Sequence, residues 1–187
     1  ATYAPLVKTE SMAGMGVFSV GEGRQVRFAK GNVLYHVGTD SWHIAPSQYA
    51  VVGDANINLG NPAYSNFIDL FAWSCGSAKF GVNPSNDDND YTGEFVDWGN
   101  NYEGDWRTLS KEEWKYLVSG RPNASQLWAN ASVVDCKGLL LLPDNWQKPE
   151  GIEFVPAYKP TDTYEEDFSA NKYTYAQWQL LELSGAL

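Results

Sequence analysis

Short apolar runs alternate with glycine-containing turns over the first quarter of the chain. Four such runs predict strands: Val17–Val20, Gln25–Phe28, Val33–Val37 and Ser41–Ile44. Because each run is separated from the next by a short turn, we expect the four strands to form an antiparallel meander.

The residues around Trp114 predict the best-defined helix of the chain. Ser110 is a favourable N-cap residue, and Glu113 follows three residues later, which is the spacing of a capping box. Gly120 offers the left-handed residue at which many helices end, and Pro122 prevents the helix from continuing.

A second helix, from Thr174 to Ser184, has the same pattern. Thr174 and Gln177 have the spacing of a capping box, and Gly185 closes the helix. The two helices are therefore predicted to be anchored in similar ways.

Three further strands are predicted between these helices. Leu127–Ala129 and Ser132–Val134 read as two strands around a turn at Asn130–Ala131, and Gly138–Leu142 reads as a strand buried on both faces. The predicted core combines these strands with the helix faces, and its members are Trp106, Leu109, Trp114, Leu117, Leu140, Leu142 and Trp178. The pattern as a whole predicts an α+β fold with short antiparallel strands, two short helices and long ordered loops.

Length and charge restrict the class of protein. The 187 residues suffice for one ordinary domain, predicted over residues 17–187 after a leader or linker at residues 1–16. The net charge of −10 disfavours nucleic acid and acidic membrane surfaces as partners. No apolar run approaches the roughly 20 residues of a spanning helix, so membrane insertion is not expected.

The histidines and the acidic loop are the two candidate metal sites of the sequence. His36 and His43 are the only two histidines, and without a third ligand they are better interpreted as solvated or half-buried strand residues than as a zinc site. The stretch Asn86–Asp90, with Glu94 and Asp97, is rich in oxygen ligands but lacks the spacing of a calcium-binding EF-hand loop. No metal site is predicted, and calcium is not favoured.

The same loop supplies the candidate ligand-binding residues. Tyr91, Asp97, Trp98 and Tyr102 combine aromatic faces with a carboxylate, a mixture suited to sugar rings. The alternative interpretation is that Trp98 anchors a long loop to the core.

Several of these motifs together resemble a known family. In chain order they are Phe18–Val20 with Val26–Tyr35, Ile68–Trp73, Asp97–Asn100, Trp106–Ser110 with Glu113–Trp114 and Tyr116–Leu117, and Gly138–Trp146. This series is similar to the exported Bacteroidetes proteins related to the Fibrobacter succinogenes major paralogous domain. The resemblance spans roughly Val17 to Leu187.

That resemblance implies a C-type-lectin-like fold, which also holds the formylglycine-generating, sulfatase-modifying enzymes. It also implies a secreted or cell-surface location and a non-enzymatic module that binds a glycan or protein ligand. The alternative is an enzyme of the formylglycine-generating type, but the two cysteines lie in contexts unlike that chemistry, and no catalytic residues are assigned. In the resembling proteins an apolar strand and a further region follow the second helix, so we expect a fragment or a short family member; the sequence specifies no oligomeric state.

The two cysteines, Cys75 and Cys136, are predicted to form a disulfide. An even count is expected in an exported chain, and neither cysteine has neighbours that would activate a thiolate. Two separate buried thiols remain the competing interpretation.

Overall fold

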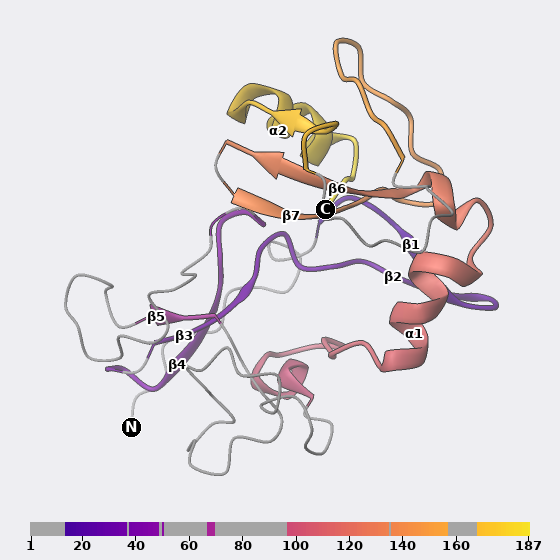
Figure 1. Cartoon of the computed structure of the whole chain (residues 1–187). Helices are drawn as coiled ribbons and strands as arrows, with labels where there is room; N and C mark the ends of the chain where they lie inside the picture. Colours follow the sequence, from indigo (N-terminus) through magenta and orange to yellow (C-terminus); the bar gives the residue numbers. More distant parts are fainter. Residues whose placement is uncertain are drawn as a thin grey trace. The chain divides into compact units, whose positions relative to one another are not determined.

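The computed structural model describes residues 14–36, 38–48, 50, 67–69, 97–134, 136–156 and 168–187. Its contacts divide the chain into two compact units, each made of two stretches: Ala1–Met12 with Lys30–Thr108, and Ala13–Ala29 with Leu109–Leu187. Small sheets and two short helices confirm the α+β class with short strands (Figure 1). The single domain predicted for residues 17–187 stays a prediction.

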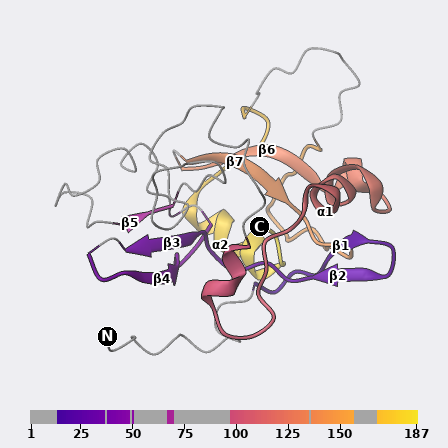
Figure 2. The same cartoon turned by 90° about the horizontal axis from the view of Figure 1, so that it is seen from below.

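The first unit contains a three-stranded sheet of order β4-β3-β5. β3 (Val33–His36) pairs antiparallel with β4 (Ser41–Ile44) on one side and with β5 (Phe67–Ile68) on the other. Figure 2 shows β3 and β4 side by side. A 3-10 turn, Trp98–Asn101, belongs to the same unit.

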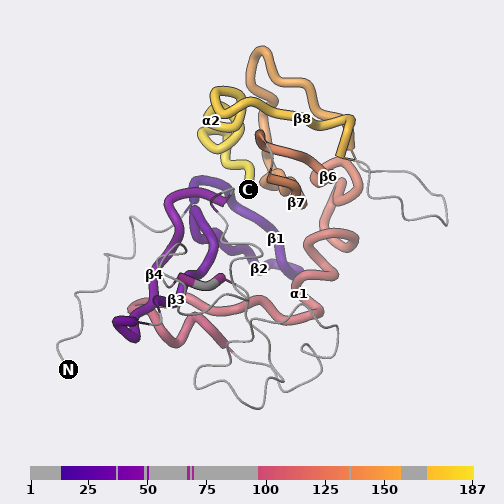
Figure 3. The backbone as a smooth tube through the Cα atoms, turned by 60° about the vertical axis from the view of Figure 1, so that its left-hand side comes forward, coloured from indigo at the N-terminus to yellow at the C-terminus, as the bar shows by residue number. Residues whose placement is uncertain are grey.

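The second unit contains two sheets. β1 (Phe18–Gly21) and β2 (Arg24–Val26) form an antiparallel hairpin. In the other sheet β6 (Trp128–Val133) lies between β7 (Cys136–Leu141), which is antiparallel to it, and β8 (Lys172–Tyr173), which is parallel (Figure 3).

Both helices begin at the predicted residues. α1 (Lys111–Lys115) starts from a capping box between Ser110 and Glu113, and α2 (Tyr175–Leu183) from one between Thr174 and Gln177. Gly185 has the expected positive φ, 90°. The end of the first helix was wrongly predicted, because α1 widens into a π turn at Tyr116–Gly120 instead of ending at a left-handed Gly120.

Two strand predictions are also wrong. The turn expected at Asn130–Ala131 is absent, because both residues pair with β7 inside a continuous β6. The expected four-strand meander is instead two hairpins in different sheets. β2 ends at Val26, so Phe28 does not take part in strand pairing. The Phe28 ring packs against the rings of Phe18 and Trp114.

The core prediction is confirmed for most residues and wrong for Trp114. Leu109, Leu117, Leu140, Leu142 and Trp178 are buried, and Trp106 is partly buried. Trp114 is 40% exposed, because its ring rests on Phe28 at a centroid distance of 5.7 Å and not inside the core. Gly138–Leu142 is buried on both faces only from Leu140 onward, since Leu139 is 42% exposed.

The π turn is completed by a buried arginine that sequence analysis did not single out. The backbone N–H of Arg121 donates to the Tyr116 carbonyl, five residues back, and Pro122 has no N–H to offer. Two carbonyls of the turn are satisfied by side chains instead: Arg121 Nε donates to Leu117 O at 2.7 Å, and Trp128 Nε1 donates to Val118 O at 3.0 Å.

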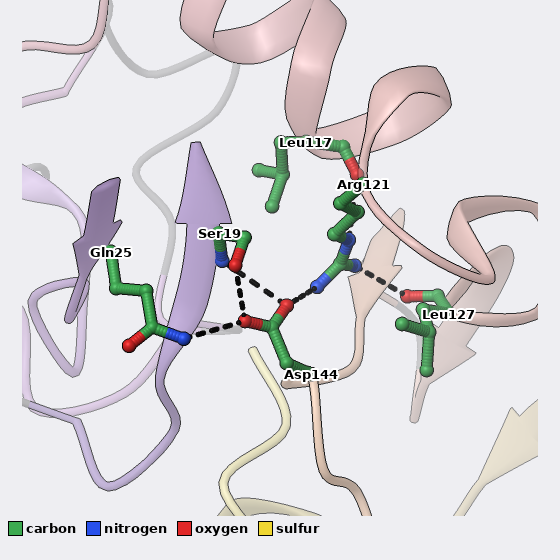
Figure 4. Close-up of polar contacts among 6 residues, drawn as sticks. All are labelled: Ser19, Gln25, Leu117, Arg121, Leu127 and Asp144. Carbon is green, nitrogen blue, oxygen red and sulfur yellow. Dashed lines mark hydrogen bonds and ion pairs between the residues drawn. The ribbon is translucent and has the colours of Figure 1, made fainter. Parts of the chain in front are cut away.

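Asp144 connects this arginine to the β1–β2 hairpin (Figure 4). Its carboxylate accepts hydrogen bonds from Arg121 Nη1 at 3.1 Å, from the Ser19 backbone and hydroxyl, and from Gln25 Nε2. Burial by itself raises the pKa of Asp144, but the hydrogen bonds from Ser19, Arg121 and Gln25 outweigh it and lower that pKa. The Asp144–Arg121 pair is thus a polar junction between the β1–β2 hairpin and the π turn.

Asn171 forms a second polar junction. Its side-chain oxygen accepts from Val155 N, and its amide nitrogen donates to the carbonyls of Val155 and Asn130. Tyr173 Oη also donates to Asn171 Oδ1 and to the Glu153 carbonyl; burial, followed by the charge of Glu153, raises the pKa of Tyr173 to about 12. The backbone at Val155 is therefore attached to β6 through Asn171, which is 3% exposed.

Candidate ligand-binding site

The candidate site lies in the first unit and is built on the β3–β4 hairpin. Tyr35 of β3 stands directly opposite Trp42 of β4. Tyr35 Oη donates to Asp40 Oδ1 at 2.9 Å; burial first, and then Asp40, raises the pKa of the Tyr35 phenol well above its usual range. Asp40 occupies the hairpin turn with a φ of 51°, so the hydrogen bond helps to hold this turn closed.

Three rings form what we call the aromatic row: Tyr35, Trp42 and Trp98. Tyr35 and Trp42 have centroids 5.0 Å apart, and Trp42 and Trp98 have centroids 5.8 Å apart with planes tilted by 34°. Tyr35 is 2% exposed, whereas Trp42 and Trp98 are partly exposed. The row therefore runs from the interior of the unit to its surface.

The backbone beside Trp98 is held by hydrogen bonds that involve the side chains of Asp97 and Thr108. Asp97 Oδ1 accepts from the backbone N–H of Gly99 at 2.9 Å and of Thr108 at 2.8 Å, and Trp98 N donates to Thr108 Oγ1 at 2.9 Å. A Cβ on Gly99 would lie 2.2 Å from the Trp106 carbonyl oxygen, so only glycine permits this close approach. The position of Trp98 is consequently set by its local backbone as well as by ring packing.

Tyr102 ends the same turn and reaches back to β4. Its hydroxyl donates to the His43 carbonyl at 2.7 Å, and burial raises the pKa of Tyr102 well above its usual range. Of the four predicted ligand-binding residues, the structure thus brings Asp97, Trp98 and Tyr102 together. Tyr91 lies outside the described residues, as do the acidic stretch Asn86–Asp90 and Cys75.

The structure shows the local contacts of these residues, and their ligand-binding role stays a prediction. Asp97 and Tyr102 use polar groups to fix the turn, and Trp98 packs on Trp42. Trp42 is the residue that sequence analysis missed. Its place on a strand was predicted, but no local pattern connects it to Trp98.

The two histidines meet through hydroxyl groups, forming what we call the histidine–hydroxyl chain. His36 Nδ1 accepts from Thr39 N and lies 2.7 Å from Thr39 Oγ1; that hydroxyl lies 2.7 Å from Ser41 Oγ, which is 2.8 Å from His43 Nε2. Both imidazoles contact the Phe67 ring edge to face. The period-two spacing of Ser41 and His43 places them on one strand face, which was the available sequence signal.

His43 is expected to titrate below the ordinary histidine value of 6.5, because burial disfavours its charged form and His36 repels it. The folded chain then binds fewer protons at His43 than the unfolded chain. The resulting contribution to stability is complete above about pH 6.5 and is lost as the pH falls through the lowered pKa.

An NMR titration of the imidazole protons measures this pKa directly. The matched variant His36→Gln removes the repulsion but leaves the burial, so the pKa of His43 should rise without reaching 6.5. A midpoint for His43 at or above 6.5 in the unmodified protein would contradict the expectation.

Among the described residues, no group of three His, Cys, Asp or Glu side chains is arranged to hold a metal ion. In the same part of the chain, no helix has the length and apolar character that crossing a membrane requires. Cys136 is partly buried at the start of β7, and its disulfide with Cys75 stays a prediction.

Comparison with known proteins adds no relative. The chain matches no protein-family model, and no significant match occurs among the curated proteins or the solved structures.

Proposed function

We propose that this chain is a non-enzymatic secreted or cell-surface binding module that recognises a glycan or protein ligand, with Trp42 and Trp98 as its aromatic contact. The observation that carries this proposal is the partly exposed indole pair, in which the backbone around Trp98 is held by Asp97 and Thr108. Flat aromatic faces supply large contact area to sugar rings and to apolar side chains alike.

The rigidity of the turn supports binding in particular. A ligand that stacks on a side chain already fixed in place does not have to immobilise it, so less conformational entropy is lost on association. Asp97 and Tyr102 then act as positioning residues for Trp98. Their hydrogen bonds to the backbone also favour recognition without calcium, because Asp97 Oδ1 is already engaged by two N–H groups.

The C-type-lectin-like fold and the exported location belong to this proposal, on the strength of the family resemblance. That fold is a scaffold for many functions, so the residues of the site must carry the assignment. The alternative enzyme of the formylglycine-generating type would depend on a reactive thiol pair. Cys75 and Cys136 lie in sequence contexts unlike that chemistry, and for this reason we favour binding.

Glycan and protein arrays probed with the unmodified chain and with Trp98→Leu test the proposal. Leucine keeps apolar packing against Trp42 but removes the broad ring face, so retention on the captured ligand should fall roughly tenfold, equivalent to about 1.4 kcal/mol. Trp114→Leu is the matched control, because Trp114 is a partly exposed tryptophan of the second unit.

Two results would contradict the proposal. The first is the absence of retained ligand on any array surface with the unmodified chain. The second is equal retention by Trp98→Leu and the unmodified chain, with circular dichroism and melting showing that both are folded.

A further inference from the structure

A histidine side chain accepts a backbone hydrogen bond in the turn between β3 and β4. The Thr39 backbone N–H donates to His36 Nδ1 at 3.0 Å. A backbone N–H can only donate, so His36 Nδ1 must offer a lone pair, and the proton of the neutral ring must lie on Nε2. This hydrogen bond therefore depends on the charge of one imidazole.

The histidine–hydroxyl chain extends this constraint to His43. Because His36 Nδ1 is an acceptor, the Thr39 hydroxyl 2.7 Å away must donate to it. Thr39 Oγ1 then accepts from the Ser41 hydroxyl, and Ser41 Oγ accepts from His43 Nε2. All donors of the chain point toward His36, which fixes the tautomers of both neutral rings.

Protonation of His36 reverses the arrangement. The charged ring carries a proton on both nitrogens, so His36 Nδ1 becomes a donor. The Thr39 hydroxyl can rotate and accept, but the Thr39 backbone N–H cannot, and it then faces a second N–H. A state with the turn open binds one more proton at His36 than the closed state. Acidic solution must therefore favour the open state.

The titratable groups around His36 do not oppose this effect. His43 lies on the same face of the sheet, and each imidazole disfavours a charge on the other. Asp40 lies in the turn, where its carboxylate accepts from the phenol of Tyr35. Asp69 directly follows β5 and is half-buried. A carboxylate favours a charged imidazole, so neither acidic residue hinders protonation of His36.

The backbone of β4 connects the turn to the indole pair. Trp42 lies between Ser41 and His43 in sequence, with its ring on the opposite face of the sheet. It packs on Trp98. The Tyr102 hydroxyl, from the end of the Trp98 turn, donates to the His43 carbonyl. A displacement of Ser41 when the turn opens is therefore passed on to Trp42.

We propose that protonation of His36 opens the β3–β4 turn and moves Trp42 away from Trp98, so that the module holds its ligand near neutral pH and releases it in mildly acidic solution. The release of ligand rests on the function proposed above, whereas the opening of the turn does not. Histidine is the side chain whose ordinary titration falls between pH 5 and 8, so this is the range in which to observe both.

NMR of the isotope-labelled chain without ligand tests the opening of the turn. At pH 7.5 the ring nitrogens of His36 should show the tautomer with its proton on Nε2. As the pH falls to 5, the Thr39 amide should lose its protection from solvent exchange relative to an unstructured amide. The indole signals of Trp42 and Trp98 should shift with the midpoint of the His36 ring.

Two substitutions separate the two imidazoles. In His36→Asn the side-chain oxygen lies close to the position of Nδ1, so it still accepts from the Thr39 N–H but cannot be protonated. The pH-dependent shifts of the indole signals should then disappear. His43→Gln keeps a donor for Ser41 and leaves His36 unchanged, so these shifts should remain.

The glycan and protein arrays measure the release of ligand. Retention on the surfaces that capture the unmodified chain at pH 7.5 should fall as the pH is lowered to 5. One coupled proton limits the fall to about tenfold per pH unit. Retention of His36→Asn on the same surfaces should be equal at the two pH values.

The opening of the turn is overturned if the His36 ring carries its proton on Nδ1 at pH 7.5, or if the indole signals of Trp42 and Trp98 do not follow the titration of His36. It is also overturned if His36→Asn is folded and keeps the pH-dependent shifts. If that variant is unfolded, the tautomer and the titration of the unmodified chain decide the question. Arrays that capture nothing at pH 7.5 contradict the proposed function alone, whereas equal retention of the unmodified chain at pH 7.5 and pH 5 overturns the release of ligand.

Discussion

Replacing Arg121 with methionine is expected to lower the free energy of unfolding by roughly 3–5 kcal/mol, the usual effect of removing one partner from a buried ion pair. The Arg121 side chain is fully buried and donates to Asp144 and to the carbonyls of Leu117 and Leu127. Methionine fills similar space, but it leaves these acceptors without their donors. Asp144 keeps its hydrogen bonds to Ser19 and Gln25, so the effect should fall in the lower part of that range.

Arg24→Met is the matched control, because it makes the same change at an exposed ion pair. Arg24 contacts Glu113 at 3.4 Å, but its side chain is 64% exposed. Exposed pairs contribute little, so the loss should stay below about 1 kcal/mol. Chemical denaturation of both variants makes the comparison, and losses of similar size would show that Arg121 is not the polar anchor of this unit.

Asn171→Asp is expected to lower the free energy of unfolding by a similar amount, although it only replaces the side-chain amide with a carboxylate. The amide nitrogen donates to the carbonyls of Val155 and Asn130, and a carboxylate has no proton to donate. A buried acceptor left unsatisfied costs about 1–3 kcal/mol, so two of them facing a new charge should cost roughly 3 kcal/mol or more at pH 7.

The loss in Asn171→Asp should also depend on pH. Burial against two carbonyls raises the pKa of the new carboxyl above its unfolded value, so the folded variant binds more protons than the unfolded one. Its deficit relative to the unmodified chain must therefore shrink as the pH falls. Denaturation at pH 7.5 and pH 5 measures this, with the exposed Asn145→Asp as control. A deficit that does not change with pH would show that the carboxyl is solvated and the contacts of Asn171 are not structural.

The predictions that succeeded depend on neighbours in sequence. A capping box connects residues three apart, so Ser110 with Glu113 and Thr174 with Gln177 carry their whole signal locally. The β3–β4 hairpin is equally local, since its two strands are joined by one short turn. Burial of Leu117 followed from its place on an apolar helix face, and that face persists into the π turn.

The features that sequence reasoning missed depend on partners distant in sequence. The partly exposed Trp114 packs on Phe28, which the alternation pattern had placed in a strand but which lies outside β2. Trp98 was recognised as an aromatic residue in a polar loop, but no sequence pattern around Trp98 or Trp42 predicts that the two rings pack together. Asn171 lies in a polar stretch without any periodic pattern, so the sequence does not indicate that its side chain is buried and hydrogen-bonded.

The π turn restricts the number of residues that the chain can have between Tyr116 and Arg121. Because the Arg121 N–H bonds five residues back, removing one residue from Tyr116–Gly120 would restore an ordinary helical register and rotate Arg121 away from Leu117 O and Asp144. Adding one residue would misplace the same side chain in the other direction. Substitutions on the exposed surface of this turn are compatible with the junction, whereas insertions and deletions between Tyr116 and Pro122 are not. A related protein that gains or loses a residue here would need a different donor for the Leu117 carbonyl.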